Sequence, residues 1–194
     1  IIFWGGCALI SQTFDITINN IFLRIMHMIG GFSPTIASYI SLRRNNKINN
    51  FKEWIKNVFD FRHNTYVYLL VCSFVAIYYI IGCLISGFEI GAPILMILVI
   101  APMMLFGGGN EEVGWRMILQ PELEKKFGFN MATIITSIIW WLWHLPIFFI
   151  QGTANASMNY FFFGIMCLSL SYALAIIRKV SNGVFPCILF HCLI

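Results

Sequence analysis

The chain has 194 residues, of which 59% are hydrophobic and only 10% are charged. Soluble domains carry about 25% charged residues, so this composition excludes an ordinary soluble domain and requires that most of the surface face lipid. The net charge of +4 could suit an anionic partner, but the charges lie in the gaps between apolar runs. No basic stripe with interleaved aromatic residues is present, which argues against nucleic-acid binding.

The length fits one domain, and we expect a single transmembrane domain over residues 1–194. The six cysteines lie almost entirely inside apolar runs and show no CxxC or zinc-ribbon spacing. We therefore interpret them as small apolar packing residues. Because the chain starts at Ile1 and stops at Ile194 within an apolar run, we expect both ends to be trimmed.

Apolar runs that are long enough to cross a bilayer recur along the chain. A spanning helix needs about 20 mostly apolar residues. The runs are continuous and do not alternate with a period of two, which predicts helices and not a barrel. We expect an all-α transmembrane bundle of about seven to eight spans, the first and last of them cut short. The visible spans lie near residues 1–14, 21–42, 66–86, 92–108, 130–150, 159–177 and 183–194.

The loops predict the orientation, because Lys and Arg are in excess on the cytoplasmic side of a membrane protein. The basic segment 43–63 is therefore expected inside the cell. It also carries apolar residues at near-helical spacing, so it is either an amphipathic helix on the inner membrane face or a solvated loop. Because successive loops alternate between the two sides of the membrane, every basic loop falls inside, including 109–129 and 178–182. The loops 15–20, 86–91 and 151–158 then fall outside.

Ionisable side chains inside apolar spans are costly to bury, so they are candidates for function. Few occur here, namely Arg24, His27, Glu111, Glu112, Arg116, His144 and His191. The two glutamates open a predicted helix after three glycines and Asn110, which is a good N-cap residue. Residues four apart share a helix face, so Glu112 can pair with Arg116 while Glu111 faces a cavity. A carboxylate in a low-dielectric site suits a general base, and Glu111 is that candidate.

Two histidines in other apolar runs complete the candidate set. His144 lies just before Pro146, where a kink could open space for water or substrate, and His191 follows Pro186. A lone histidine in an apolar helix is more often a packing residue than a functional one. The presence of Glu111 reverses this preference for His144 and favours a functional role. Three polar groups on three apolar segments can supply a base, a partner for water and a donor for the oxyanion. The absence of HExxH and GxSxG excludes the common zinc-peptidase helix and the simplest serine hydrolase.

These motifs resemble those of the CAAX-protease and bacteriocin-processing family of intramembrane endopeptidases. EEVGWR, from Glu111 to Arg116, matches the family motif EExxxR in full. The motif FxxxH is matched by Trp140 and His144, with Trp in place of the usual Phe. The motif HxxxN or HxxxD begins at His191, and its last position, 195, falls just past the end of the chain. The resemblance covers roughly residues 90–194, and GFSPTIASYI at 31–40 is similar to an earlier family segment.

The resemblance implies a catalytic core over 92–194 and a water-filled cavity open to the cytoplasmic side and to lipid. Glu111 and His144 would activate the attacking water, and His191 with residue 195 would hold the oxyanion. Glu112 and Arg116 would support this geometry as an ion pair. Glu111, His144 and His191 could hold Zn²⁺ with an open fourth position, or could act without a metal. We expect a metalloprotease.

The small bacterial members that the chain resembles are linked to bacteriocin self-immunity or to maturation of secreted peptides. We therefore predict an endopeptidase of the bacterial plasma membrane that cleaves a membrane-associated peptide or protein, not specifically a prenylated one. One alternative is a non-catalytic membrane immunity or scaffold protein with the same fold. A transporter or channel is a weaker alternative, because the chain lacks repeat symmetry. The oligomeric state is left open.

Overall fold

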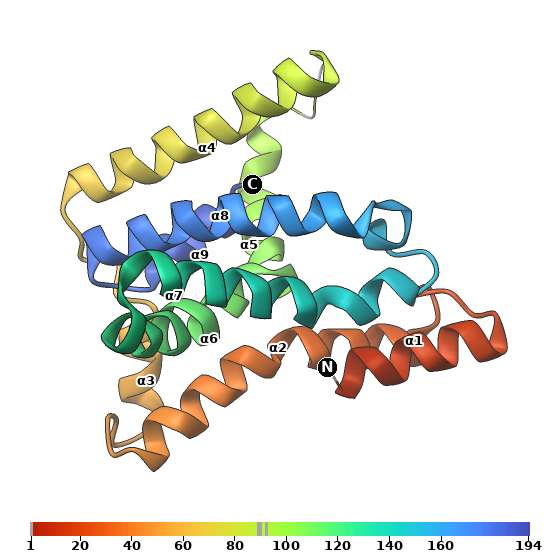
Figure 1. The fold of residues 1–194 in the computed structure, drawn as a ribbon, viewed down its shortest axis with the longest axis horizontal. Helices are drawn as coiled ribbons and strands as arrows, with labels where there is room; N and C mark the ends of the chain where they lie inside the picture. The colour runs from red at the N-terminus through yellow and green to blue at the C-terminus, as the bar shows by residue number, and fades with distance from the viewer. Residues whose placement is uncertain (1, 89–90, 92) are drawn as a thin grey trace. The chain divides into compact units, whose positions relative to one another are not determined.

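The computed structural model describes residues 2–88, 91 and 93–194. All regular structure in these residues is helical, with no strand, as Figure 1 shows, and the all-α prediction is confirmed. Parts of the predicted loop 86–91 and of the predicted spans 1–14 and 92–108 fall on residues 1, 89, 90 and 92, which lie outside the described residues.

The predicted apolar runs form helices with nearly the expected bounds. The helices are α1 (Ile2–Phe14), α2 (Ile21–Arg44), α3 (Phe51–Val58), α4 (Thr65–Ser86), α5 (Ile97–Gly107), α6 (Glu112–Gly114), α7 (Gln120–His144), α8 (Tyr160–Ser181) and α9 (Phe185–Cys192). Short 3₁₀ segments join them, namely η1 (Ile94–Met96), η2 (Gly109–Glu111), η4 (Leu145–Phe149) and η5 (Ala154–Ser157). A π-helical turn, η3 (Trp115–Leu119), connects α6 to α7.

Within the described residues, three helical segments are long and apolar enough to cross a membrane: Thr65–Ser86, Gly109–Phe149 and Tyr160–Ser181. The chain is therefore an integral membrane protein. Ile2–Phe14 and Ile94–Gly107 are apolar but shorter. The count of seven to eight spans and the predicted orientation stay predictions.

The segment Gly109–Phe149 is not one straight helix. Its 41 residues would extend about 60 Å as a continuous α-helix, twice the thickness of the hydrocarbon core. Gly128 interrupts it with φ 73° and ψ 173°, a conformation that glycine adopts readily and that other residues avoid. The apolar part after Gly128 corresponds to the span predicted over 130–150.

The chain forms two compact units. The first consists of Ile1–Ser33 with Leu119–Tyr172. In it α1 packs on η4, and the Gln12 side chain donates a hydrogen bond of 2.9 Å to the Phe149 carbonyl. The small core of this unit contains Cys7, Ala8, Leu23 and Ile150.

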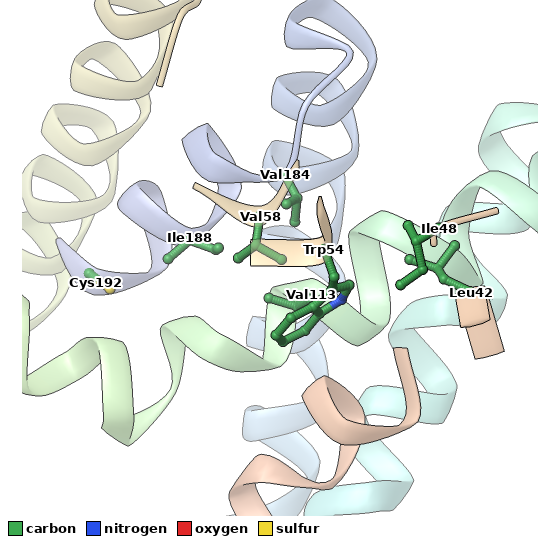
Figure 2. Packing of buried hydrophobic residues seen from close by; sticks show 8 residues of the cluster. All are labelled: Leu42, Ile48, Trp54, Val58, Val113, Val184, Ile188 and Cys192. Atoms are coloured by element: carbon green, nitrogen blue, oxygen red, sulfur yellow. The ribbon is translucent and has the colours of Figure 1, made fainter. Parts of the chain in front are cut away.

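The second unit consists of Pro34–Ile118 with Ala173–Ile194. Within it α9 lies against α4, α5, η2 and α6. Figure 2 shows its buried apolar cluster, which contains Leu42, Ile48, Trp54, Val58, Val113, Val184, Ile188 and Cys192. Because Val113 of α6 is buried in this cluster, the packing also fixes the backbone that carries the neighbouring Glu112.

The basic segment 43–63 contains the short helix α3, so the helical interpretation is confirmed for Phe51–Val58. The Asn50 side chain accepts a hydrogen bond of 2.9 Å from the Glu53 amide, and the Glu53 carboxylate accepts one of 2.8 Å from the Asn49 amide. These bonds cap the helix start. Hydrogen bonds from the Asn49 backbone and side chain lower the pKa of the Glu53 carboxyl. The position of α3 on a membrane face stays a prediction.

The cysteines carry no disulfide, and the packing interpretation holds for four of them. Cys7, Cys167, Cys187 and Cys192 are buried. It is wrong for Cys72 and Cys83, which are exposed. Both belong to α4, a helix with few buried residues, and an apolar side chain on such a surface can face lipid.

Candidate functional site

The two adjacent glutamates lie at the junction of η2 and α6. Glu111 ends η2 and is 4% exposed, whereas Glu112 begins α6 and is completely buried. Arg116, in the π-helical turn, is also completely buried. Taking charged groups out of water is costly unless they are paired, so this cluster requires close polar partners.

Glu112 supplies those partners by binding two side chains at once. Arg116 Nε donates a hydrogen bond of 3.0 Å to Glu112 Oε2, so the predicted ion pair is confirmed. His191 Nδ1 lies 2.7 Å from Glu112 Oε1. An ionised carboxylate only accepts hydrogen bonds, so Nδ1 of His191 carries the proton. The three side chains form a buried Arg116–Glu112–His191 chain in the second unit.

The link from Glu112 to His191 was not predicted from the sequence. The two residues are 79 positions apart, and no local pattern connects them. A buried carboxylate on one imidazole nitrogen fixes the ring orientation and determines what the other nitrogen can do. His191 Nε2 is therefore the atom that this arrangement offers for chemistry.

The glycines before Glu111 give His191 and α9 their space. A Cβ atom at position 108 would lie 2.9 Å from His191 Nε2. At position 109 it would lie 2.4 Å from Cys192 Sγ and 3.3 Å from the Ile188 carbonyl oxygen. The glycine run therefore allows the turn between α5 and α6 to approach α9 closely.

The N-cap prediction for Asn110 is wrong. Asn110 lies inside η2, and its side chain caps neither η2 nor α6. Thr35 Oγ1 instead donates to the Asn110 side-chain and main-chain oxygens at 2.8 Å and 2.6 Å. The η2 backbone closes its own turn, because the Glu111 amide donates to the Gly108 carbonyl at 2.9 Å. The Asn110 side chain is thus used to tie η2 to α2.

The hydrogen bonds between Thr35 and Asn110 give the segment 31–40 a structural role. The part of this segment from Pro34 onward belongs to the second unit. A Cβ atom at Gly114 would lie 2.5 Å from Pro34 Cβ and 2.7 Å from the Pro34 carbonyl oxygen. Pro34 and Thr35 of α2 therefore contact both ends of the Asn110–Gly114 stretch. The similarity of this segment to an earlier family segment is the only sequence signal that pointed to it.

His144 is the last residue of α7, and η4 begins at the next position. The chain thus changes from α-helix to 3₁₀-helix just before Pro146, and the kink expected there stays a prediction. His144 Nδ1 lies 2.8 Å from the Trp140 carbonyl oxygen, which can only accept a hydrogen bond. Nδ1 therefore carries the proton, and in the neutral ring Nε2 is the basic nitrogen.

Aromatic rings surround His144 within the first unit. The ring centroids of Trp4, Trp140, Trp143 and Phe163 lie 5.5, 5.6, 4.9 and 5.1 Å from that of His144. Trp140 is the aromatic residue of the second motif. Trp4 was missed by sequence reasoning, and its indole N–H donates a hydrogen bond of 2.8 Å to the carbonyl of His27, one of the ionisable residues of the sequence.

The structure brings Glu111, Glu112, Arg116 and His191 together in the second unit, whereas His144 belongs to the first unit. Both imidazoles bind an oxygen acceptor through Nδ1, as metal-ligating histidines usually do. In the described part of the chain, however, no group of three His, Cys, Asp or Glu side chains is placed to hold a metal ion. The zinc site of Glu111, His144 and His191 stays a prediction.

Comparisons with known proteins agree with the resemblance predicted from the motifs. Residues 92–194 match the family model described as type II CAAX prenyl endopeptidase Rce1-like. The matched stretch contains every predicted site residue. The whole chain is also similar to a protein named CAAX prenyl protease 2 from Methanococcus maripaludis, at 25% identity over 219 aligned residues that cover 77% of that protein.

Proposed function

Because the chain belongs to the Rce1-like family of type II CAAX prenyl endopeptidases, we propose that it hydrolyses a peptide bond in a membrane-associated peptide or protein. The observation that supports this most directly is the buried Arg116–Glu112–His191 chain beside Glu111. Buried ionisable groups in a membrane protein are expensive to maintain and usually serve function.

In the proposed reaction Glu111 and His144 act on one water molecule. The Glu111 carboxylate or His144 Nε2 takes a proton from the water while its oxygen attacks the carbonyl carbon of the scissile bond. The tetrahedral intermediate then collapses, the C–N bond breaks, and the proton passes to the leaving amine. The aromatic rings around His144 fix its orientation and exclude other water.

His191 is proposed to stabilise the negative charge on the carbonyl oxygen. With Nδ1 bound to Glu112, a doubly protonated ring donates from Nε2 to the oxyanion. Arg116 holds the second oxygen of the Glu112 carboxylate and thereby prevents it from rotating away from His191. The ion pair thus acts through His191, as a positioning device.

The proposed substrate is a peptide or protein that reaches the site from the membrane. The name of the relative refers to prenylated proteins, whereas the motifs also resemble those of bacteriocin-processing members. We propose the broader class, a membrane-associated peptide, with bacteriocin maturation or self-immunity as one biological use. Because the basic loops predict which side of the membrane is cytoplasmic, we propose that the site opens toward that side.

A metal ion remains a separate proposal. If Zn²⁺ binds, Glu111, His144 and His191 are the residues that would hold it, and the ion would acidify a bound water. The anchored Nδ1 atoms of both histidines fit this role and fit metal-free catalysis equally well. Metal analysis of the purified protein, compared with His144→Ala, tests the point: zinc bound at one equivalent by the parent and lost from the variant supports the metal site.

Glu111→Gln tests the catalytic proposal. We expect at least about a 100-fold loss of peptide cleavage, because the isosteric amide cannot accept the proton from water. Glu122→Gln is the matched control, because Glu122 is half-exposed and its 2.7 Å ion pair with Lys125 lies on the surface, where such pairs contribute little. The assay uses full-length protein in lipid vesicles with fluorogenic peptides, one set prenylated and one set unmodified.

The same experiment separates the proposed function from a non-catalytic role. Cleavage by the parent and the control, but not by Glu111→Gln, supports the peptidase. Equal cleavage by parent and Glu111→Gln would refute the assignment of the base. An immunity phenotype that survives in Glu111→Gln cells would favour a binding or scaffold protein with the same fold.

A further inference from the structure

The backbone of Arg116 belongs to a π-helical turn that a proline follows closely. Residues Trp115–Leu119 form a π-helical turn, in which each carbonyl pairs with the amide five positions ahead. Five positions after Arg116 stands Pro121, which has no amide hydrogen. A buried carbonyl at this position can accept a hydrogen bond from a side chain of another element.

Arg178 supplies that hydrogen bond. Its Nε–H donates to the Arg116 carbonyl oxygen at 2.9 Å, across a sequence separation of 62 residues. Arg178 lies in the last turn of α8, and both residues belong to the second unit. The donor and the acceptor therefore lie on those parts of α8 and η3 that belong to the same compact unit.

The end of α8 holds the Arg178 side chain in position. Asn182 has a positive φ of 51°, and its amide donates a hydrogen bond of 3.0 Å to the Arg178 carbonyl. This left-handed residue ends the helix. The Asn182 side-chain oxygen also accepts from Arg178 Nη1 at 3.3 Å, so the guanidinium contacts both Asn182 and the Arg116 backbone.

We propose that Arg178 is a positioning residue for the candidate site. Its guanidinium fixes the Arg116 backbone, the Arg116 side chain fixes Glu112, and Glu112 fixes the His191 imidazole. The consequence for catalysis rests on the proposed function, whereas the effect on His191 does not. Lysine is a poor substitute, because its ammonium lacks the planar, fixed direction of the Arg178 Nε–H.

The test compares Arg178→Met, Arg178→Lys and Lys179→Met in full-length protein in nanodiscs. Lys179→Met is the matched control, because it removes the same charge from the next, exposed position of α8. One readout is kcat and KM for peptide cleavage. The other is the Nδ1–H resonance of His191 in protein labelled with ¹⁵N-histidine, which reports its hydrogen bond to Glu112 directly.

We expect Arg178→Met to lower kcat about tenfold at nearly unchanged KM, because a displaced donor misaligns the reacting groups. It should also shift the His191 Nδ1–H resonance, and Arg178→Lys should do both to a smaller extent. Lys179→Met should leave both readouts at the parent values. If Arg178→Met does not yield monodisperse protein, Arg178→Lys, which keeps the charge, carries the comparison.

Two results would overturn the proposal. One is an Arg178→Met protein with parent kcat, whatever its stability. The other is a variant of lower stability in which the His191 resonance does not move, because a merely structural role predicts that pattern. If the parent cleaves no peptide, the proposed function fails, but the His191 resonance still decides whether Arg178 positions the imidazole.

Discussion

Glu112 joins two side chains whose requirements differ. Arg116 needs a negative charge to compensate its burial, whereas His191 needs an acceptor of fixed direction. A single carboxylate meets both requirements because each of its oxygens binds a different partner. Removing Glu112 should therefore damage stability and activity for two separate reasons, and these can be separated by a second substitution.

Glu112→Gln should lower the free energy of unfolding by about 3–5 kcal/mol, because the buried Arg116 guanidinium loses the carboxylate that its Nε binds. The double variant Glu112→Gln with Arg116→Met should recover most of that stability, since the buried charge is gone. Peptide cleavage should not recover, because His191 still lacks its carboxylate. Thermal unfolding and the vesicle cleavage assay measure the two effects.

Glu122→Gln again serves as the control, with an expected change below about 1 kcal/mol for an exposed pair. A double variant as unstable as Glu112→Gln alone would show that the lost charge balance is not the cause. Recovery of cleavage in the double variant would show that His191 does not depend on Glu112.

Gly108 and Gly107 differ in what a methyl group would touch. A Cβ atom at position 108 would meet His191 Nε2 at 2.9 Å, whereas at position 107 its nearest contact is Met104 Sδ at an ordinary 3.5 Å. Gly108→Ala should therefore displace the imidazole and lower kcat about tenfold or more. Gly107→Ala should cleave peptide at the parent rate. Equal cleavage rates in the two variants would mean that the space beside His191 Nε2 has no role in catalysis.

At the scale of the elements, the sequence predicted the helices well because their apolar runs are continuous. The predicted run at 66–86 became α4, at Thr65–Ser86, and the run at 159–177 became α8, at Tyr160–Ser181. The ion pair of Glu112 with Arg116 was predictable too, since it depends only on helical periodicity. These features are local, and local spacing determines them.

The features that were missed depend on contacts between distant segments. The bonds from His191 to Glu112 and from Arg178 to Arg116 form only when α8 and α9 pack against the segment that follows α5. The role of Asn110 was predicted wrongly for the same reason, because Thr35 of α2 binds its side chain. Helix-capping preferences describe a chain segment alone, and here a neighbouring helix overrides them.

The interruption of helical conformation at Gly128 within α7 can be tested by substitution. Gly128→Ala should lower the free energy of unfolding by about 1–3 kcal/mol, because φ 73° with ψ 173° is a conformation that only glycine adopts without strain. Gly82→Ala, in the interior of α4 with no atom within 4 Å of the new Cβ, should raise it by about 0.4–1 kcal/mol.

Thermal unfolding of the two variants in the same detergent gives the comparison. The identical chemical change should move the midpoint in opposite directions. A Gly128→Ala protein as stable as the parent would mean that the chain can continue as a regular helix through this position. The break would then not be required by the fold.

At the scale of the whole molecule, the predicted catalytic residues come from both compact units. Glu111 and His191 belong to the second and His144 to the first. The family resemblance assigns these three residues to one site. No periodicity or spacing in the sequence could have joined residues in such different parts of the chain. The proposal that Glu111 and His144 share one water molecule is therefore the claim that most needs an experiment.

Kinetic non-additivity provides that experiment. If Glu111 and His144 activate the same water, the first substitution already removes the function that the second would remove. We expect Glu111→Gln and His144→Ala each to lower kcat/KM at least about 100-fold, and the double variant to lose little more than the poorer single variant.

The control cycle pairs Glu111→Gln with Glu122→Gln, for which the effects should add because Glu122 lies on the surface. Losses that multiply in the Glu111–His144 cycle as well would mean that the two side chains act independently. In that case each residue would need its own role, and a single glutamate–histidine site could not account for the cleavage.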